Sequence, residues 1–480
     1  MFHGVKKSEV KPLTEAEIKK NQETLTKIRA IQQKILQIRN NPGYDQKDMD
    51  FLLKSCSLMP DFPSIWNIRK EKLEHFISSN PWSQVIDLMK REIKSIFPIM
   101  MKNPKSYLLW YHRVWCLSKV LEIETSQNIP LEQCIIMPEI ELCNKFTLKD
   151  DRNFHCWNYR VQLLTLINKH YAHTFNTFVL NELKYTLDKI KVNFSNFSAW
   201  NYRAKLIAIH FFHHNIAWNT PTALAFFNDD LQLLKQALYT DPKDQSPWNY
   251  HHWLCCNFIP IYVTNVHVDT SSNTVNVSVK YSNVFKIKSV VNVSNAKGVN
   301  VDNANAFSDT LKLKVDPQIA FDGGDTAITV TNKVSEEIKV DFDNLSMITN
   351  KVCFTKENLT LPTVYVHKDG KVKVVMDNVM KFQMEFLKEQ VTMVKELIEQ
   401  STGMFVENAH HRLAQLYHAF YMILVVSQDE KEVEEAKEYR KKEIEEYKVL
   451  MEKSKRMNNM YKSILQELLK EEEKEKGEEG

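Results

Sequence analysis

Residues 150–164 read DDRNFHCWNYRVQLL, and variants of this stretch occur five times along the 480-residue chain. Each copy has a tryptophan, an arginine or histidine three residues later, and then an apolar stretch at helical spacing. Residues three apart lie on one face of a helix. The pattern therefore predicts five related helices, centred on Trp66, Trp110, Trp157, Trp200 and Trp248.

A second helical pattern precedes the tryptophan segments, as in VLNELKYTLDKIKV at residues 179–192, ahead of Trp200. The repeat unit is therefore a helical hairpin. One hairpin cannot bury its apolar face, whereas five stacked hairpins share a continuous core. We expect a mainly α fold, a right-handed α–α superhelix over residues 1–259, with the tryptophans as core anchors.

The periodicity changes after this repeat domain. Residues 260–375 alternate apolar and polar positions and are rich in β-branched residues, as in TAITVTN at residues 326–332. Lys-Asp-Gly-Lys at residues 368–371 is typical of a hairpin turn. About seven short strands of this kind predict an inserted antiparallel β-sandwich, immunoglobulin-like in type.

Helical patterning returns at residues 376–470. The stretch FVENAHHRLAQLYHAF at residues 405–420 is interpreted as a decayed sixth repeat, with His410 in the tryptophan position. Residues 471–480 form a charged tail that we expect to be disordered.

Glycine is scarce throughout the chain. Average usage of roughly 7% would give about 34 glycines, but the chain has nine, and residues 44–297 contain none. Phosphate-binding loops and dinucleotide fingerprints need glycine where the backbone turns sharply or approaches a pyrophosphate. Nucleotide-binding α/β folds and protein kinases are therefore excluded.

The balance of charge is nearly neutral, with 63 Lys and Arg against 60 Asp and Glu. A net charge of +3 gives no general argument for binding nucleic acid. No window approaches 18 consecutive apolar residues, and the first residues lack the apolar core of a secretory signal, so we expect no transmembrane segment. The eight cysteines include no Cys-x-x-Cys pair, which favours a reduced, cytoplasmic protein.

Histidines cluster at two places, but neither cluster predicts a metal site. His210, His213 and His214 form one group, and His251 and His252 form the other. Both groups lack cysteine partners, and their side chains mostly point to different helix faces. We therefore interpret them as surface or core histidines and expect no metal bound by this chain.

The stretches PKSYLLWYHR at residues 104–113, DRNFHCWNYR at 151–160 and DPKDQSPWNYHHWL at 241–254 closely resemble the repeats of protein prenyltransferase α subunits. The β insert after the fifth unit makes the chain similar to the Rab geranylgeranyltransferase members in particular. One departure is that no Leu-x-x-Leu-x-Leu pattern follows residue 470, whereas animal members carry a leucine-rich-repeat domain. We expect this difference to affect architecture more than function.

The resemblance implies an enzyme subunit that is active only with a β subunit. The reaction is transfer of a geranylgeranyl group from its diphosphate to C-terminal cysteines of Rab GTPases, which a Rab escort protein presents. The implied cofactor is zinc, held by the β subunit together with most of the lipid pocket. The bases three residues after each tryptophan then pair between hairpins or, alternatively, contact the β subunit.

Residues that differ between repeats are the candidates for function, because a residue kept in every unit is explained by stacking. The resemblance places Lys105 at the diphosphate leaving group, with His155 beside the same pocket as a second catalytic residue. A positioned cation stabilises the charge that develops on the diphosphate. The candidate substrate-binding residues nearby are Tyr107, Arg152, Asn153 and Phe154, although a packing role for the two aromatic residues fits equally well.

Two other classes of protein are alternatives to the enzyme subunit. A non-catalytic helical scaffold that binds peptides or partner proteins would fit the repeat length of 43 to 48 residues. It would not explain why the second and third units alone carry Lys-Ser-Tyr and Arg-Asn-Phe-His before their tryptophans. An RNA-binding repeat protein is disfavoured by the near-neutral charge.

Overall fold

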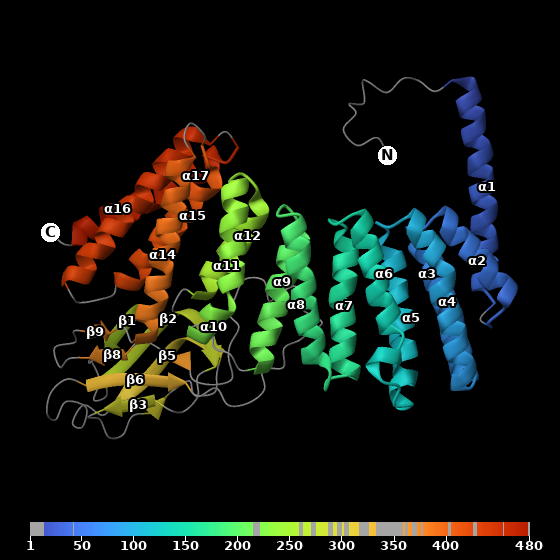
Figure 1. The fold of residues 1–480 in the computed structure, drawn as a ribbon, viewed down its shortest axis with the longest axis horizontal. Helices are drawn as coiled ribbons and strands as arrows, with labels where there is room; N and C mark the ends of the chain where they lie inside the picture. Colours follow the sequence, from blue (N-terminus) through green and yellow to red (C-terminus); the bar gives the residue numbers. More distant parts are fainter. Residues whose placement is uncertain are drawn as a thin grey trace. The chain divides into compact units, whose positions relative to one another are not determined.

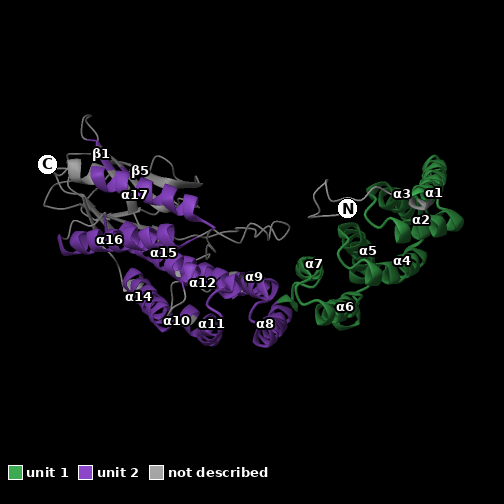
Figure 2. Cartoon of the chain, turned by 90° about the horizontal axis from the view of Figure 1, so that it is seen from above, with its two compact units in different colours: residues 1–175 green, residues 176–480 purple. Residues whose placement is uncertain are grey.

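A computed structural model of the chain describes residues 14–41, 43–214 and 221–258, the strands given below, and residues 378–401, 405–425, 430–454 and 456–478. The chain divides into two compact units, Met1–Phe175 and Asn176–Gly480, which Figure 2 shows in green and purple. None of the described helices is long and apolar enough to cross a membrane.

The first unit is made of helices joined by short turns (Figure 1). Consecutive helices pack as hairpins. The packing is most extensive in the hairpins at residues 82–126 and 136–170. The helices are α1 (Glu15–Arg39), α2 (Gln46–Leu58), α3 (Pro63–Ser79), α4 (Trp82–Lys102), α5 (Tyr107–Ser126), α6 (Ile136–Lys149) and α7 (Phe154–His170), with a short 3₁₀ helix, η2 (Leu131–Gln133), ahead of α6.

The second unit continues the hairpins and contains the β insert. Its helices before the insert are α8 (Phe175–Val192), which begins at the boundary residue, α9 (Phe197–His214), α10 (Pro221–Phe226), α11 (Asn228–Thr240) and α12 (Gln245–Phe258). Those after it are α14 (Asn378–Gln400), α15 (Glu407–Leu424), α16 (Glu430–Lys453) and α17 (Asn458–Glu478).

The five tryptophans are core anchors, as the sequence predicts. All are at most 4% exposed. Each indole Nε1 donates to the backbone carbonyl six residues earlier, at distances of 2.7 to 2.9 Å. This bond ties the turn before each tryptophan helix to that helix, because a buried indole N–H needs an acceptor. The acceptors are Pro60, Pro104, Asp151, Phe194 and Pro242.

The arginines three residues after the tryptophans are buried, and Arg69, Arg113 and Arg203 pair between hairpins. Arg113 in α5 donates to both oxygens of Glu139 in α6, at 2.6 and 2.7 Å, and Tyr159 of α7 donates to the same carboxylate. A single buried acid therefore joins two successive tryptophan helices. The same arrangement joins Arg69 and His112 through Glu92, and Arg203 and Tyr250 through Asp230.

The insert contains nine described strands, all paired antiparallel. One sheet has the order β1-β2-β5-β4; in the other, β3-β6-β8-β9, strand β7 also pairs with β6. Whether the insert is an immunoglobulin-like sandwich stays a prediction. Strands β8 and β9 are adjacent in sequence and pair as expected, although the turn between them lies outside the described residues. The strands are β1 (Val263–Asp269), β2 (Val275–Lys286), β3 (Val291–Ser294), β4 (Asn300–Val301), β5 (Phe307–Val315), β6 (Thr326–Asn332), β7 (Leu359–Thr360), β8 (Thr363–Val366) and β9 (Val372–Val375).

Helices α14 to α17 form the end of the second unit. Helix α15 begins three residues before His410, just as the tryptophan helices α5, α7, α9 and α12 begin three residues before their tryptophans. This offset supports a decayed sixth repeat. The last helix differs from expectation, because α17 continues through the charged segment to Glu478 instead of ending near residue 470. Glu and Lys are good helix formers, and Glu471 pairs with the buried Arg440 at 2.9 Å.

Candidate functional site

Lys105 lies in the turn before α5, and two hydrogen bonds fix that turn. The carbonyl oxygen of Pro104 accepts from Trp110 Nε1 at 2.9 Å and from Asn153 Nδ2 at 3.2 Å. The first bond comes from α5, the helix that follows the turn. The second comes from the N-cap residue of α7. The backbone that carries Lys105 is thus held by both helices.

The Lys105 side chain reaches into solvent. It is 70% exposed, and its ammonium lies 3.4 Å from Oδ2 of Asp150, whose side chain is 40% exposed. An exposed pair of this kind contributes little to stability. Asp150 therefore limits where the ammonium lies without removing it from reach of an anionic ligand.

Asn153 acts on the fold of the site. It is buried and forms the N-cap of α7, where its Oδ1 accepts from the backbone N–H groups of His155 and Cys156. Its Nδ2 is bonded to Pro104. Because both polar atoms of the side chain are bonded, Asn153 positions the site. Asn196 caps α9 through the N–H of Ala199 in the same way, so this position is shared between repeats.

Three rings lie together beside Lys105. The rings of Tyr107 and His155 meet edge to face with centroids 4.2 Å apart, and Phe154 lies 4.0 Å from His155. Tyr107 and Phe154 are 65% and 46% exposed, whereas His155 is buried beneath them. The first two residues therefore present an aromatic surface next to a cation, suited to a ligand with an apolar chain and an anionic head.

His155 is kept neutral by its surroundings. Burial lowers its pKa, the charge of Lys105 lowers it further, and Asp61 opposes the shift. Among the described residues, neither ring nitrogen has a hydrogen-bond partner. At neutral pH the imidazole can therefore donate one N–H to a ligand and accept at the other nitrogen.

Arg152 adds a second cation at the surface. Its backbone N–H donates to Oδ1 of Asp150 at 3.1 Å. Its side chain is exposed, and no described residue pairs with the guanidinium. The structure thus brings Lys105 and Arg152 to the same carboxylate, Lys105 by its side chain and Arg152 by its backbone.

The N-termini of α5 and α7 strengthen the positive field. Neither helix has an acidic residue in its first turn, and Ser106 makes no capping hydrogen bond at the start of α5. Helix N-termini favour anions through their unpaired N–H groups and the helix dipole. Cations, helix ends and aromatic rings therefore gather at one place.

Asp150 is the site residue that the sequence analysis missed. It stands seven residues before Trp157, and Asn193 and Asp241 stand at the same position in their own repeats. In all three repeats the side-chain oxygen accepts a hydrogen bond from the backbone N–H two residues later. Aligning the turns would have identified this shared bond. The contact with Lys105 could not be found in this way, because it joins neighbouring repeats.

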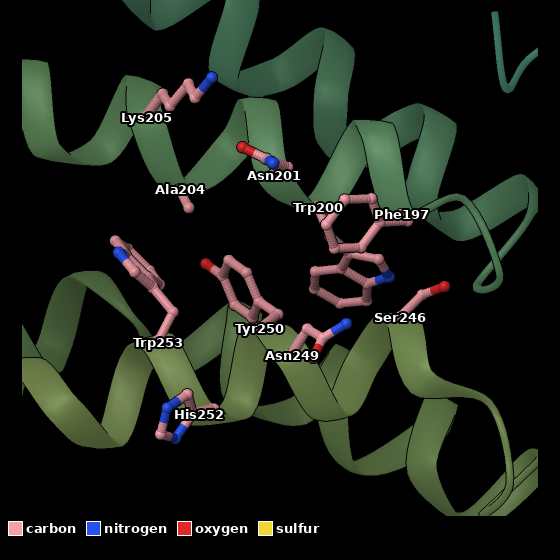
Figure 3. Close-up of a pocket in the computed structure, with 10 residues that line it drawn as sticks. All are labelled: Phe197, Trp200, Asn201, Ala204, Lys205, Ser246, Asn249, Tyr250, His252 and Trp253. Carbon is pink, nitrogen blue, oxygen red and sulfur yellow. The ribbon is translucent and has the colours of Figure 1, made fainter. Parts of the chain in front are cut away.

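A separate pocket of about 280 Å³ lies between α9 and α12 (Figure 3). Figure 3 shows the rings of Trp200, Tyr250 and Trp253 between the two helices, with centroids 4.7 and 5.2 Å apart along the series. Burial lowers the pKa of Lys205, which also lines this pocket. The pocket suits an apolar or aromatic side chain of a partner.

Within the part of the chain that the structure describes, no three histidine, cysteine or acidic side chains are gathered as metal ligands. The histidine pair of α12 illustrates this. Burial and the charge of Arg412 lower the pKa of His251 to about 3 and of His252 to about 4. These imidazoles are packed beside a cation, which disfavours a metal ion. The expectation that they lack cysteine partners is wrong, because Cys255 Sγ lies 3.5 Å from His251 Nε2 and Cys256 Sγ lies 3.6 Å from His252 Nδ1.

The fold is that of a helical-hairpin repeat protein, in which one repeat turn carries an exposed lysine beside two exposed aromatic rings. A family description, "Protein prenyltransferase alpha subunit repeat", matches residues 89–120, 137–167, 179–209 and 227–258. The chain is 31% identical over 259 residues to "Geranylgeranyl transferase type-2 subunit alpha" of Rattus norvegicus, covering 53% of this chain and 41% of the relative. It is 30% identical over 283 residues to the Candida albicans protein of that name, covering 73% of the latter.

The chain belongs to the protein prenyltransferase α-subunit family and is similar to the type-2 geranylgeranyl transferase members. It spans about two fifths of the length of the mammalian relatives. A solved structure, "Candida albicans protein geranylgeranyltransferase-I complexed with GGPP", aligns with a TM-score of 0.35 at 19% identity over 47% of this chain and 65% of that one. This agreement is too low to carry an argument.

Proposed function

We propose that the chain is the α subunit of a heterodimeric protein geranylgeranyltransferase that modifies C-terminal cysteines of Rab GTPases. The names of its relatives supply the reaction class. The observation that carries the proposal is the cluster of Lys105, His155, Tyr107 and Phe154 at the ends of two adjacent repeat helices. A helical scaffold has no need of a cation and exposed rings at that point.

The proposed role of the site is to stabilise the leaving group. As the bond between the allylic carbon and oxygen loosens, negative charge accumulates on the diphosphate. Lys105 and Arg152, with the N-terminus of α5, meet that charge, and one such preorganised donor is worth roughly 2.7 to 4 kcal/mol. His155 donates an N–H to a diphosphate oxygen, while Tyr107 and Phe154 contact the first isoprene units.

The remaining parts of the proposal lie outside this chain. Zinc would activate the acceptor thiol and would belong to the β subunit, since the described residues provide no ligand set for it. A Rab escort protein would present the Rab substrate, and the complex would act in the cytoplasm. Geranylgeranyl diphosphate is the proposed lipid donor.

Co-purification followed by a transfer assay tests the proposal. The tagged chain should recover a β subunit, and the pair should transfer labelled geranylgeranyl from its diphosphate to a Rab protein when escort protein is added. The chain alone should transfer none. A stable monomer that recovers no β subunit and binds peptides would instead support the scaffold alternative, for which the aromatic pocket between α9 and α12 is the natural docking place.

A further inference from the structure

The buried ion pairs follow a rule at the described junctions between repeats. At each such junction one acidic side chain accepts two sets of hydrogen bonds. One comes from the arginine three residues after the tryptophan of one repeat, and the other comes from the residue two positions after the tryptophan of the next repeat. Arg203, Asp230 and Tyr250 form the last junction of this kind. The charges are balanced, since each buried guanidinium faces one buried carboxylate.

The junction of α12 with α14 and α15 breaks the rule. His251 stands where the other described junctions have arginine, and its Nε2 lies 3.2 Å from Oε1 of Gln390, an amide in place of an acid. Counting from His410, Arg412 occupies the position that Tyr250 fills one unit earlier. A cation has therefore been added at a junction that has lost its carboxylate.

Among the residues that the structure describes, Arg412 has only neutral partners. It is 9% exposed and donates to His252 Nδ1, to Gln415 Oε1 and, at 3.4 Å, to the carbonyl of Trp248. Its Nε is buried without a hydrogen bond, and no described carboxylate pairs with it. An uncompensated buried charge is costly, so a counter-ion would be favoured.

A cavity of about 420 Å³ lies beside this guanidinium, between α12, α15, α16 and α17. Arg412, Gln415 and His252 line one part of it. His418 and Glu471, which also line it, have side chains 46% and 57% exposed, so solvent reaches the cavity. The space is large enough for a small organic molecule and has hydrogen-bond donors at the cationic end.

We propose that this cavity binds a small carboxylate, whose charge lies against the Arg412 guanidinium. The acidic residues that α16 and α17 contribute to the lining decide the charge of the ligand. Glu443 is bonded to Arg440 and His418, and Glu471 to Arg440, while Glu467 has no described partner. A dianion such as phosphate would be repelled by these acids more strongly than a single carboxylate, whose charge balances the Arg412 guanidinium. The site is independent of the proposed transferase function.

Thermal unfolding in acetate tests the proposal. The purified chain, or its complex if only that is recovered, is heated in rising sodium acetate with sodium chloride keeping the ionic strength constant. Tm should rise by about 2 °C when acetate reaches roughly ten times its Kd. Phosphate at equal ionic strength should give a smaller rise; a response to phosphate alone would overturn the carboxylate assignment.

Two variants separate binding from stability. Arg412→Met should lose the acetate response and, without acetate, unfold no lower than the wild type. The matched Arg203→Met should lose several degrees, because Asp230 loses its charged partner and keeps the tyrosine hydroxyl of Tyr250. Gln390→Glu, which restores a carboxylate beside His251, should weaken the acetate response. A wild-type Tm that does not change with acetate would overturn the proposal. An equal loss of stability in Arg412→Met and Glu467→Gln would show that Glu467 is the counter-ion, and would overturn it as well.

Discussion

The side-chain amide of Asn153 donates a 3.2 Å hydrogen bond to the carbonyl oxygen of Pro104, 49 residues earlier in the chain. This bond joins the N-cap of α7 to the turn that presents Lys105. The position of the cation in one repeat is therefore set by a buried residue of the next.

Asn153→Ala should reduce both stability and turnover. Loss of the N-cap costs about 1 kcal/mol of folding free energy, and the freed turn should let Lys105 move from the leaving group. We expect roughly a tenfold fall in kcat with KM for the Rab substrate unchanged. Asn196→Ala is the comparison variant, since Asn196 caps α9 at the same position one repeat later. Equal loss of turnover in both variants would mean that Asn153 acts only through stability.

Lys105→Ala should leave the heterodimer intact and lower turnover by about a hundredfold, the scale of one lost electrostatic donor. The side chain is mostly exposed, so its removal costs little stability. Lys243→Ala is the control, because Lys243 occupies the same position before Trp248 and is also exposed. Single-turnover rates measure the effect, and unchanged rates in Lys105→Ala would remove this residue from the mechanism.

The pKa of His155 should lie below its ordinary value and should rise when Lys105 is replaced. Burial is the main cause of the depression and the Lys105 charge the second. NMR titration of labelled histidine in wild type and Lys105→Ala measures both values. An unchanged pKa in the variant would mean that the two side chains do not interact.

The direction of the pH effect on stability follows from the same shift. As the pH falls below the unfolded value of about 6.5, the unfolded chain takes up a proton before folded His155 does. The contribution of His155 to stability is therefore present above that pH and is lost as the pH falls through the folded pKa. His155→Phe should flatten this part of the Tm–pH curve.

Much of the helical fold could be predicted from the sequence, because the tryptophan period sets both the helices and their stacking. The buried positions of the five tryptophans are confirmed, and the bases that follow them are buried as well. The acids that complete the pairs, such as Glu139, could not be found so easily. They lie in the first helix of each hairpin, whose pattern is weaker, and nothing local shows which glutamate is buried.

The candidate site was only partly predictable for a related reason. The resemblance and the comparison of repeats together identified Lys105, Tyr107 and His155, which the structure brings together, although Lys243 stands at the Lys105 position of the fifth repeat. The same comparison treated Asn153 as distinctive, although Asn196 performs the same capping one unit later. The function of a polar residue at a helix start depends on whether its side chain turns back to the backbone, and sequence spacing does not determine that.

Breaking a buried pair between hairpins should destabilise the repeats far more than breaking an exposed one. In Arg113→Met, Glu139 keeps only its bond from Tyr159 and becomes an uncompensated buried charge, so we expect a loss of about 3 to 5 kcal/mol in the free energy of unfolding. Lys119→Met is the control on the same helix. Its partner Glu122 lies 3.4 Å away and is 46% exposed, so the loss should be below about 1 kcal/mol. Urea denaturation measures both values, and similar losses would show that the Arg113–Glu139 pair does not hold successive hairpins together.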